Sequence, residues 1–225
     1  LGNNATEKEI EDFFKLKEKE TVISLKAETH NFPTTVEPFN GAATGTGGEI
    51  RDRMGGGKGS FPIAGTAVYM TSYPRFDSKT VGNNKERKWE KTAPRKWLYQ
   101  SPQEILTKAS NGASDFGNKF GQCIICGSLL TFEHTGKQKG VEANNPDFGY
   151  DKVIMQAGGI GYAKKSDAAK ETPEKGDKIV LLGGDNYRIG MGGGAVSSVN
   201  TGKYGNDIEL NAIQRANPEM QKRDY

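Results

Sequence analysis

The sequence has few cysteines and histidines and no long hydrophobic run. Only two of its 225 residues are cysteines and two are histidines. Two cysteines cannot form the framework of a disulfide-rich secreted domain, so a cytoplasmic location is expected. No apolar run approaches the ~18 residues that a membrane-spanning helix needs, and the first residues do not form a signal-peptide pattern. We therefore expect no membrane partner.

The sequence also has no large excess of charge of one sign, because 31 basic residues are balanced by 28 acidic ones for a net charge of +3. This balance argues against a dedicated nucleic-acid-binding protein. The segment from Phe76 to Gln100 is basic and contains Trp89 and Trp97. Basic residues beside aromatic ones can bind single strands. We favour a solvent-exposed insertion that its tryptophans hold to the rest of the domain, because no recognisable nucleic-acid-binding module surrounds this segment.

The residues from Thr21 to Glu28 (TVISLKAE) predict a strand, because β-branched and aliphatic types dominate. Alternation places Lys26 and Glu28 on one face together with Val22 and Ser24, and His30 is next in phase. The other face carries Ile23, Leu25 and Ala27. A cation, a carboxylate and an imidazole then line one edge at spacings of about 6–7 Å. This pattern predicts a functional site.

Glycine is abundant, with 30 residues, about twice the usual ~7%. The run Gly41–Gly48 (GAATGTGG) is predicted to be a loop, because each glycine costs backbone entropy in a regular element. Backbone N–H groups in such a loop can converge on phosphate. Arg51 can bind phosphate bidentately, and Glu49 and Asp52 with Glu28 could hold Mg²⁺. The alternative is a surface loop with ordinary solvated charges.

The motif KAETHNFPT (residues 26–34) followed by GAATGTGGEIRD (residues 41–52) resembles the phosphoribosylformylglycinamidine synthase family. These are ATP-dependent amidotransferases of purine biosynthesis, here in their large single-chain form. Later segments agree in order, among them PIAGTAVYMTS, MQAGGIGYA, DKIVLLGGDNYRIGMGGGAVSS and IQRANPEMQKR. The resemblance extends over nearly all residues from Thr21 onward, and it implies that the chain is a piece of a longer enzyme.

The resemblance implies an α/β (α+β) fold with a mixed sheet flanked by helices. Residues 1–165 are expected to form an N-terminal domain like that of aminoimidazole ribotide synthetase (PurM-like), and residues 166–225 the incomplete start of the C-terminal domain. The implied reaction converts formylglycinamide ribotide, ATP and glutamine to formylglycinamidine ribotide. ATP would phosphorylate the amide oxygen, and ammonia from a glutaminase domain elsewhere in the parent chain would displace the phosphate. The isolated piece is expected to be inactive.

The resemblance also implies roles for individual residues. His30 would be the catalytic general base, because its pKa lies near the working pH. Glu28 and Asp52 would hold Mg²⁺. The ribotide would contact Thr29, His30, Asn31 and Arg51. ATP would contact Lys26, Gly41, Ala42, Ala43, Thr44, Gly45, Thr46, Gly47, Gly48, Glu49, Ile50, Arg51, Asp52, and a turn at Cys126, Gly127 and Ser128. Many relatives have histidine where this chain has Phe32, so a second imidazole is not expected here.

The remaining segments predict further helices and strands. Helices are expected over Glu7–Leu16, from the capping box at Ser101 to Asn111–Gly112, and over Asp207–Ala216 with Ile208, Ala212 and Ile213 inward. Strands are expected over Pro62–Ser72, Cys123–Phe132 and Val153–Ala163, and a further strand is expected to begin in Asp177–Gly183. A loop is expected at Gly117–Gly121.

Cys123 and Cys126 have the C-x₂-C spacing of zinc and redox sites. A zinc site needs four ligands, and no second cysteine pair is present. The apolar, strand-like surroundings favour buried structural thiols. His134 shows no partner pattern and is expected to be a surface histidine or one whose hydrogen bonds are satisfied.

Three alternative functions remain open. A sister synthetase, such as aminoimidazole ribotide synthetase or selenophosphate synthetase, would share the architecture. The run Gly190–Ala195 matches G-x-G-x-x-A, which is a weak signal of a dinucleotide-binding oxidoreductase. Finally, the chain could be a nucleotide-binding scaffold without catalytic activity.

Overall fold

The computed structural model describes residues 6–7, 18–76, 99–134, 148–182 and 196–225. The helix predicted over Glu7–Leu16 therefore falls almost entirely outside the described residues. The glycine cluster Gly190–Ala195 and most of the basic segment 76–100 also lie outside them.

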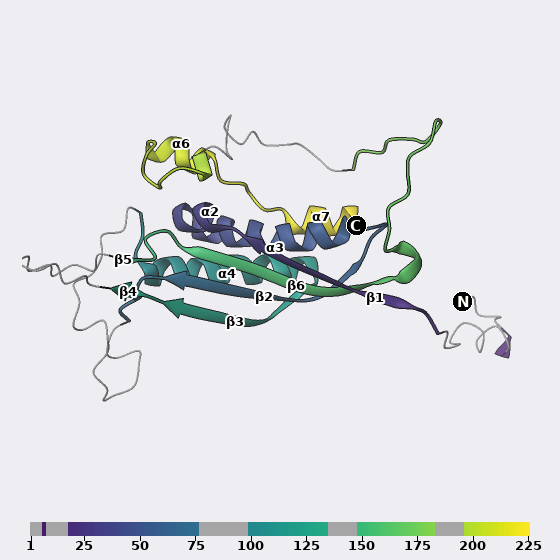
Figure 1. Ribbon diagram of the computed structural model, residues 1–225, viewed down its shortest axis with the longest axis horizontal. Coiled ribbons are helices and arrows are strands. Elements are labelled where there is room, and N and C mark those ends of the chain that lie inside the picture. The colour runs from purple at the N-terminus through teal and green to yellow at the C-terminus, as the bar shows by residue number, and fades with distance from the viewer. Residues whose placement is uncertain (1–5, 8–17, 77–98, 135–147, 183–195) are drawn as a thin grey trace, which may run out of the picture.

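A four-stranded mixed sheet forms one layer of the molecule (Figure 1). Its strands are β1 (Thr21–Thr29), β2 (Phe61–Thr71), β3 (Cys123–Thr131) and β6 (Ile154–Lys164), in the order β1-β6-β2-β3. The strand β6 runs antiparallel to both β1 and β2, whereas β2 and β3 are parallel. Each of these strands was predicted, and the β2–β3 register shifts between Gly65 and Thr66. A separate two-stranded sheet joins β4 (Glu133–His134) to β5 (Phe148–Gly149).

The second layer consists of helices on one face of this sheet. It contains α2 (Asn31–Val36), α3 (Pro38–Met54) and α4 (Pro102–Phe120), and α7 (Pro218–Asp224) packs on α4. Between the layers lies a core of alanines with one tyrosine and one methionine, made of Ala42, Ala67, Tyr69, Ala109, Ala113, Met155 and Ala157. The predicted α/β class with a mixed sheet is confirmed.

The prediction that Gly41–Gly48 forms a loop was wrong, because the whole run lies inside α3. A Cβ atom on Gly41 would collide with the backbone of Pro33 in α2, and one on Gly47 would lie 2.7 Å from the Phe116 ring in α4. The glycines therefore let α3 approach its neighbours closely. Each mid-helix glycine costs roughly 0.5–1 kcal/mol relative to alanine, and the close packing offsets this cost.

The helix α4 begins as predicted but is longer. Ser101 caps it through a complete capping box with Glu104. The predicted end at Gly112 was wrong, and so was the loop at Gly117–Gly121, because the helix continues to Phe120 and ends at Gly121 in the left-handed conformation, φ 97°. A Cβ on Gly112 would collide with the backbone of Phe39. Gly112 thus serves a close helix contact and not a helix end.

The opposite face of the sheet is open in the described part of the chain. Ile23 and Leu25 on β1 are 72% and 71% exposed, and Ile125 on β3 is 67% exposed. Cys123 and Cys126 are exposed on β3 as well, so the prediction of buried thiols was wrong. The helices cover only one face, and a strand pattern alone cannot tell which face is covered.

The C-terminal residues differ in detail from the prediction. The helix α6 spans only Asn206–Asn211, and Ile208 is 53% exposed, although Ile213 is buried as expected. Glu209 is buried instead and accepts hydrogen bonds from the Tyr99 hydroxyl and from the Gly202 N–H (2.8 Å). Residues 177–182 form no strand within the described chain. The division at residue 165 stays a prediction.

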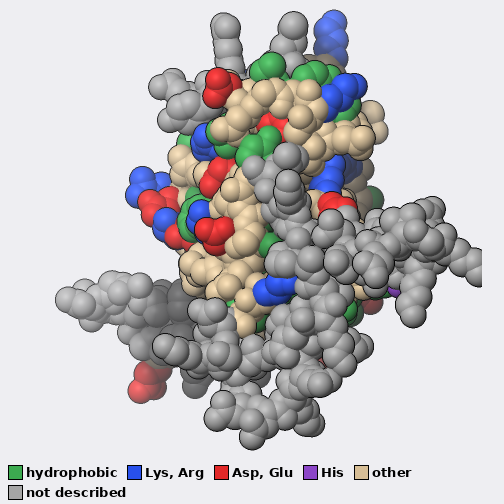
Figure 2. Space-filling view, turned by 90° about the vertical axis from the view of Figure 1, so that its left-hand side faces the viewer, with side chains coloured by type: hydrophobic (Ala, Val, Ile, Leu, Met, Phe, Trp, Pro, Cys, Tyr) green, Lys and Arg blue, Asp and Glu red, His purple; other side chains and the backbone are tan. Residues whose placement is uncertain are grey.

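The surface charges agree with the small net charge. Seen from the end of the molecule that carries β4 and β5, basic and acidic side chains are interspersed among the described residues (Figure 2). None of the described helices has both the length and the apolar content to cross a membrane.

Candidate functional site

Two of the predicted site residues, Lys26 and Glu28, lie on β1 on the side that faces α3. The strand alternates as predicted, with Lys26 and Glu28 half-buried against the helix layer. The Lys26 Nζ atom lies 2.7 Å from an Oδ atom of Asp52 on α3 and 3.4 Å from an Oε atom of Glu28. The seam between β1 and α3 therefore collects two carboxylates around one ammonium group. We call it the β1–α3 seam and define it by Lys26, Glu28, His30, Arg51 and Asp52.

His30 follows β1 directly and is half-buried at the start of α2. Its Nδ1 atom lies 2.5 Å from the carbonyl oxygen of Gly41. A carbonyl oxygen can only accept, so Nδ1 carries the proton and the Nε2 lone pair is free in the neutral ring. Burial lowers the pKa of His30, and the hydrogen bond to Gly41 and the charge of Glu28 oppose this shift only in part. His30 is therefore a neutral imidazole near pH 7 with one nitrogen available to accept a proton.

Gly45 explains why α3 can pass so near to this ring. A Cβ atom on Gly45 would lie 3.0 Å from Cβ of His30. This spacing is tighter than ordinary van der Waals contact. A second role of the predicted glycine run is thus to bring the backbone of α3 close to the candidate site.

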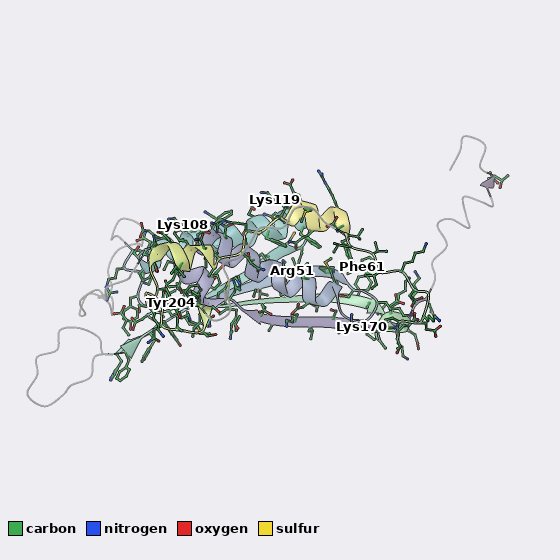
Figure 3. All side chains as sticks on the ribbon, turned by 90° about the horizontal axis from the view of Figure 1, so that it is seen from above. Arg51, Phe61, Lys108, Lys119, Lys170 and Tyr204 are labelled. Carbon is green, nitrogen blue, oxygen red and sulfur yellow. The ribbon has the colours of Figure 1, made fainter. Side chains whose placement is uncertain are left out.

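Arg51 lies on α3, in the middle of the molecule (Figure 3). Burial lowers the pKa of its guanidinium, whereas the neighbouring carboxylates of Asp52 and Glu28 raise it. Its Nη1 atom donates a hydrogen bond to Oε1 of Gln221 on α7, at 3.1 Å. Sequence reasoning missed Gln221, because 170 residues separate it from Arg51 and no local motif marks such a long-range contact.

Most of the run from residue 41 to 52 points away from the seam. Ala42, Ala43, Thr46 and Ile50 are buried in the core. Glu49 is fully buried and forms an ion pair with Arg53, at 2.6 Å. Because a helix presents only one side to a ligand, Gly45, Gly48, Arg51 and Asp52 are the members that remain beside β1.

The other predicted contacts lie farther away or are already used. Cys126, Gly127 and Ser128 are on β3, at the opposite edge of the sheet from β1. Three strand spacings separate these edges, roughly 14 Å. Thr29 is exposed, and the Asn31 side chain accepts a hydrogen bond from the Met155 N–H at 3.1 Å.

The carboxylates of the seam suit a hard cation that brings its own oxygen ligands. Among the described residues no group of three or more His, Cys, Asp or Glu could hold a metal unaided. Glu28 and Asp52 do converge on one cation already, the Lys26 ammonium. Mg²⁺ is commonly bound by one or two carboxylates together with waters and substrate phosphates. The donor set therefore fits Mg²⁺ that arrives with a phosphate ligand.

A hollow of about 430 Å³ lies beside the seam. Its walls include Lys26 and Asp52, and the hydroxyl-bearing residues Ser24 and Ser60. This volume lies within the size range of small-molecule pockets. The seam thus has room next to it for part of a ligand.

Comparison with known proteins identifies relatives of the chain. No model of a protein family matches it. Phosphoribosylformylglycinamidine synthase from Drosophila melanogaster is 39% identical over 211 residues, which are 93% of this chain and 15% of the relative. The synthase from Homo sapiens is 41% identical over 206 residues, 89% of this chain and 14% of the relative. The chain thus spans about one-seventh of the length of these relatives, and the resemblance drawn from the sequence is confirmed.

A solved structure shows the same fold. T. maritima PurL complexed with FGAR matches 90% of this chain and 26% of its own chain, with a TM-score of 0.55 and 22% identity. Another relative comes from Arabidopsis thaliana and is described as a probable phosphoribosylformylglycinamidine synthase, chloroplastic/mitochondrial. It is 41% identical over 90% of this chain and 14% of its own length. Relatives of this kind thus include one described as an organelle protein, and the predicted cytoplasmic location stays a prediction.

Proposed function

We propose that this chain, which matches a segment of phosphoribosylformylglycinamidine synthase over most of its length, forms part of the ATP and formylglycinamide ribotide site of such an enzyme. One observation carries the proposal. The β1–α3 seam brings together a neutral imidazole, two cations and two carboxylates from the two motifs on which the resemblance rests. Both proposed ligands are anions that carry phosphate, and the seam offers cationic groups for them.

The reaction proposed for the whole enzyme is the ATP-dependent amidation of formylglycinamide ribotide with ammonia derived from glutamine. His30 would accept a proton through Nε2, from the substrate amide or from the incoming ammonia. The hydrogen bond from Nδ1 to the Gly41 carbonyl fixes the ring in the orientation and tautomer that this role requires. General-base catalysis of this kind contributes about 10²–10⁴-fold to the rate.

The cations and carboxylates of the seam would bind the phosphate groups. Arg51 would pair with phosphate oxygens through the guanidinium N–H groups that do not bond to Gln221. Mg²⁺, when bound, would neutralise phosphate charge. Glu28 and Asp52 would hold it, and Lys26 would then turn from the carboxylates toward the phosphate.

A glutaminase partner is required, because the chain supplies no glutaminase site of its own among the described residues. Such a site needs a nucleophilic cysteine activated by a nearby histidine. Cys123 and Cys126 lie exposed on β3, while His30 is bonded to Gly41 and the His134 ring stacks with Phe132 and Phe148. A glutaminase domain elsewhere in the longer protein would provide the ammonia.

Isothermal titration calorimetry of the 225-residue chain tests the proposal. Mg-ADP and formylglycinamide ribotide should each bind, and Arg51→Ala should weaken the binding of each by about 1–3 kcal/mol, the range for a charge-assisted contact. Arg223→Ala is the matched control, since Arg223 is exposed on α7. Binding of neither ligand to the folded chain would refute the proposal. Binding of Mg-ADP alone would favour a nucleotide-binding scaffold.

A further inference from the structure

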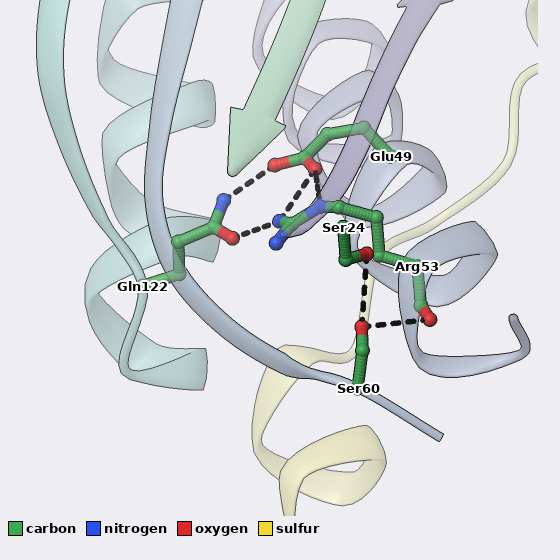
Figure 4. A network of polar contacts seen from close by, with 5 residues as sticks. All are labelled: Ser24, Glu49, Arg53, Ser60 and Gln122. Carbon is green, nitrogen blue, oxygen red and sulfur yellow. Dashed lines mark hydrogen bonds and ion pairs between the residues drawn. The ribbon is translucent and has the colours of Figure 1, made fainter. Parts of the chain in front are cut away.

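The helix α3 also carries a buried charged pair that the proposed chemistry does not use. Glu49 and Arg53 are one helical turn apart, and their side chains are 0% and 1% exposed. Arg53 donates to one Glu49 oxygen through Nε at 2.8 Å and through Nη2 at 2.6 Å. Gln122, between α4 and β3, donates to the other Glu49 oxygen and accepts from Arg53. We call these three residues the buried trio (Figure 4).

Glycines on two adjacent strands make the space for the buried trio. A Cβ on Gly159 of β6 would collide with the Glu49 carboxylate, and one on Gly161 would lie 2.9 Å from Nη1 of Arg53. On β2, a Cβ on Gly65 would lie 2.6 Å from the Gln122 amide nitrogen. Any larger residue at these places would push the charged groups off the sheet. The helix and the sheet therefore fit together only in the position in which the trio fills this slot.

Stability alone does not account for a buried ion pair. Removing two charges from water costs several kcal/mol per ion, and apolar residues of similar volume often replace such pairs without loss of stability. Burial raises the pKa of Glu49, and Gln122 and Arg53 oppose the shift. One donor, Nη1 of Arg53, is buried without a hydrogen-bond partner among the described residues. The arrangement is therefore better suited to defining one geometry than to lowering the free energy of the fold.

That geometry is the rotation of α3 about its own axis. Successive helix residues are turned by about 100°, so Arg51 lies on the side of α3 opposite to Glu49 and Arg53. Asp52, next to it, reaches Lys26 on β1. Ser60 extends the linkage, because its hydroxyl donates to the Arg53 carbonyl at 2.9 Å and lies 3.1 Å from the Ser24 hydroxyl on β1. Turning α3 would move Arg51 and Asp52 away from Glu28 and Lys26.

We infer that the buried trio sets the rotation of α3 and thereby positions Arg51 and Asp52 in the β1–α3 seam. Glu49, Arg53 and Gln122 are positioning residues in this role, and they touch no ligand. The consequence for ligand binding rests on the function proposed above. The geometric part does not, because it concerns only how α3 lies against β1.

The test replaces the pair by apolar residues in the 225-residue chain. The double variant Glu49→Leu, Arg53→Met should still fold, since apolar replacements of a buried ion pair are often neutral or stabilising. It should melt somewhat below the wild type, because the buried Gln122 amide loses its hydrogen bonds to both residues. Its control is Asp115→Leu, Lys119→Met, which removes another i,i+4 ion pair, at 3.0 Å and half-exposed on α4.

Two measurements follow, and one of them needs no ligand. A Cβ on Gly48 would lie 3.4 Å from Cγ of Glu28, so the wild type should show a nuclear Overhauser effect between Gly48 Hα and Glu28 Hγ. This effect should be lost in the double variant and retained in the control. Affinity for Mg-ADP should fall at least tenfold in the double variant. The additional change Arg51→Ala should then reduce the affinity for Mg-ADP much less in the double variant than in the wild type, because the guanidinium is already misplaced.

The outcomes separate the inference from the proposed function. An unchanged Overhauser effect in a folded double variant overturns the inference, whether or not nucleotide binds. If the wild type binds no Mg-ADP, the proposed function fails, and the Overhauser effect alone decides the inference. If the double variant does not fold, Arg53→Lys serves instead, because lysine keeps the charge but cannot make the paired contacts. The Overhauser effect should weaken there, and full retention of it overturns the inference.

Discussion

Lys26 on β1 and Asp52 on α3 form an ion pair of 2.7 Å across the seam between the sheet and the helix layer. The hydrogen bond to Asp52 raises the pKa of Lys26. Both side chains remain partly exposed, at 34% and 51%, so a phosphate or a metal ion can compete for either partner. A contact of this kind contributes little to folding, and in the function proposed above its role is to bind the ligand.

Asp52→Asn should therefore leave the melting temperature nearly unchanged but reduce the dependence of ADP binding on Mg²⁺. The amide keeps the shape of the side chain and removes the charge that a hard cation needs. The measurement is the ratio of ADP affinities with Mg²⁺ and with a chelator, compared with Asp115→Asn on α4 as the control. A ratio equal to that of the wild type would exclude Asp52 as a metal ligand.

His30 should make the protein less stable in acid. Its pKa in the folded state lies below the ordinary value of 6.5. As the pH falls below about 6.5, the unfolded chain takes up a proton that the folded chain resists, so the free energy of unfolding decreases. Urea unfolding between pH 7.5 and 5 should show a smaller decrease for His30→Asn than for the wild type. His134→Asn, at an exposed ring, should keep the wild-type slope, and equal slopes for all three proteins would contradict the assignment.

Gly112→Ala should destabilise the protein, although alanine favours helices. In an exposed helix the change would stabilise by roughly 0.5–1 kcal/mol. Here the added methyl group would collide with the backbone of Phe39, and overpacking of this kind costs about 1–3 kcal/mol. Gly205→Ala is the control, because nothing lies within 4 Å of that site and its φ is −62°. Denaturant unfolding that shows Gly112→Ala to be as stable as the wild type would refute the close contact.

Ser101→Ala should cost about 1 kcal/mol of stability through the loss of the N-cap of α4. The serine hydroxyl accepts from the Glu104 N–H, and the Glu104 side chain accepts from the Ser101 N–H at 2.8 Å. Ser110→Ala changes the same residue type at an exposed position inside α4 and should be neutral or slightly stabilising. If urea unfolding gives the same midpoint for both variants, the capping box contributes nothing.

Local patterns were enough to predict several elements correctly. The alternation in β1 placed Lys26 and Glu28 together on one face of the strand, because side chains alternate along any strand whatever lies around it. The box at Ser101 marked the start of α4, because a cap is satisfied within one turn. Within the candidate site, the structure places Lys26 and Glu28 near Asp52, and the roles predicted for these residues stay predictions.

The glycine run shows where local reasoning fails. Read alone, Gly41–Gly48 has the composition of a loop, because glycine disfavours helices. The decisive contacts come from Pro33 and Phe116, on other elements, where any side chain on α3 would collide. Gly112 was likewise misread as a helix end, because its role is a close contact with the backbone of Phe39. A glycine that provides close packing cannot be distinguished in sequence from one that provides a turn.

The amino-acid sequence by itself determined the four strands of the main sheet, the capped start of α4, the α/β class and the resemblance to a synthase segment, because these depend on neighbouring residues and on motif identity. Only the tertiary structure decided which sheet face is covered, that Glu49 is buried against Arg53, and that Gln221 reaches Arg51. These features depend on contacts between residues far apart in the chain. Their free energies arise only when the layers pack together, so no local pattern records them.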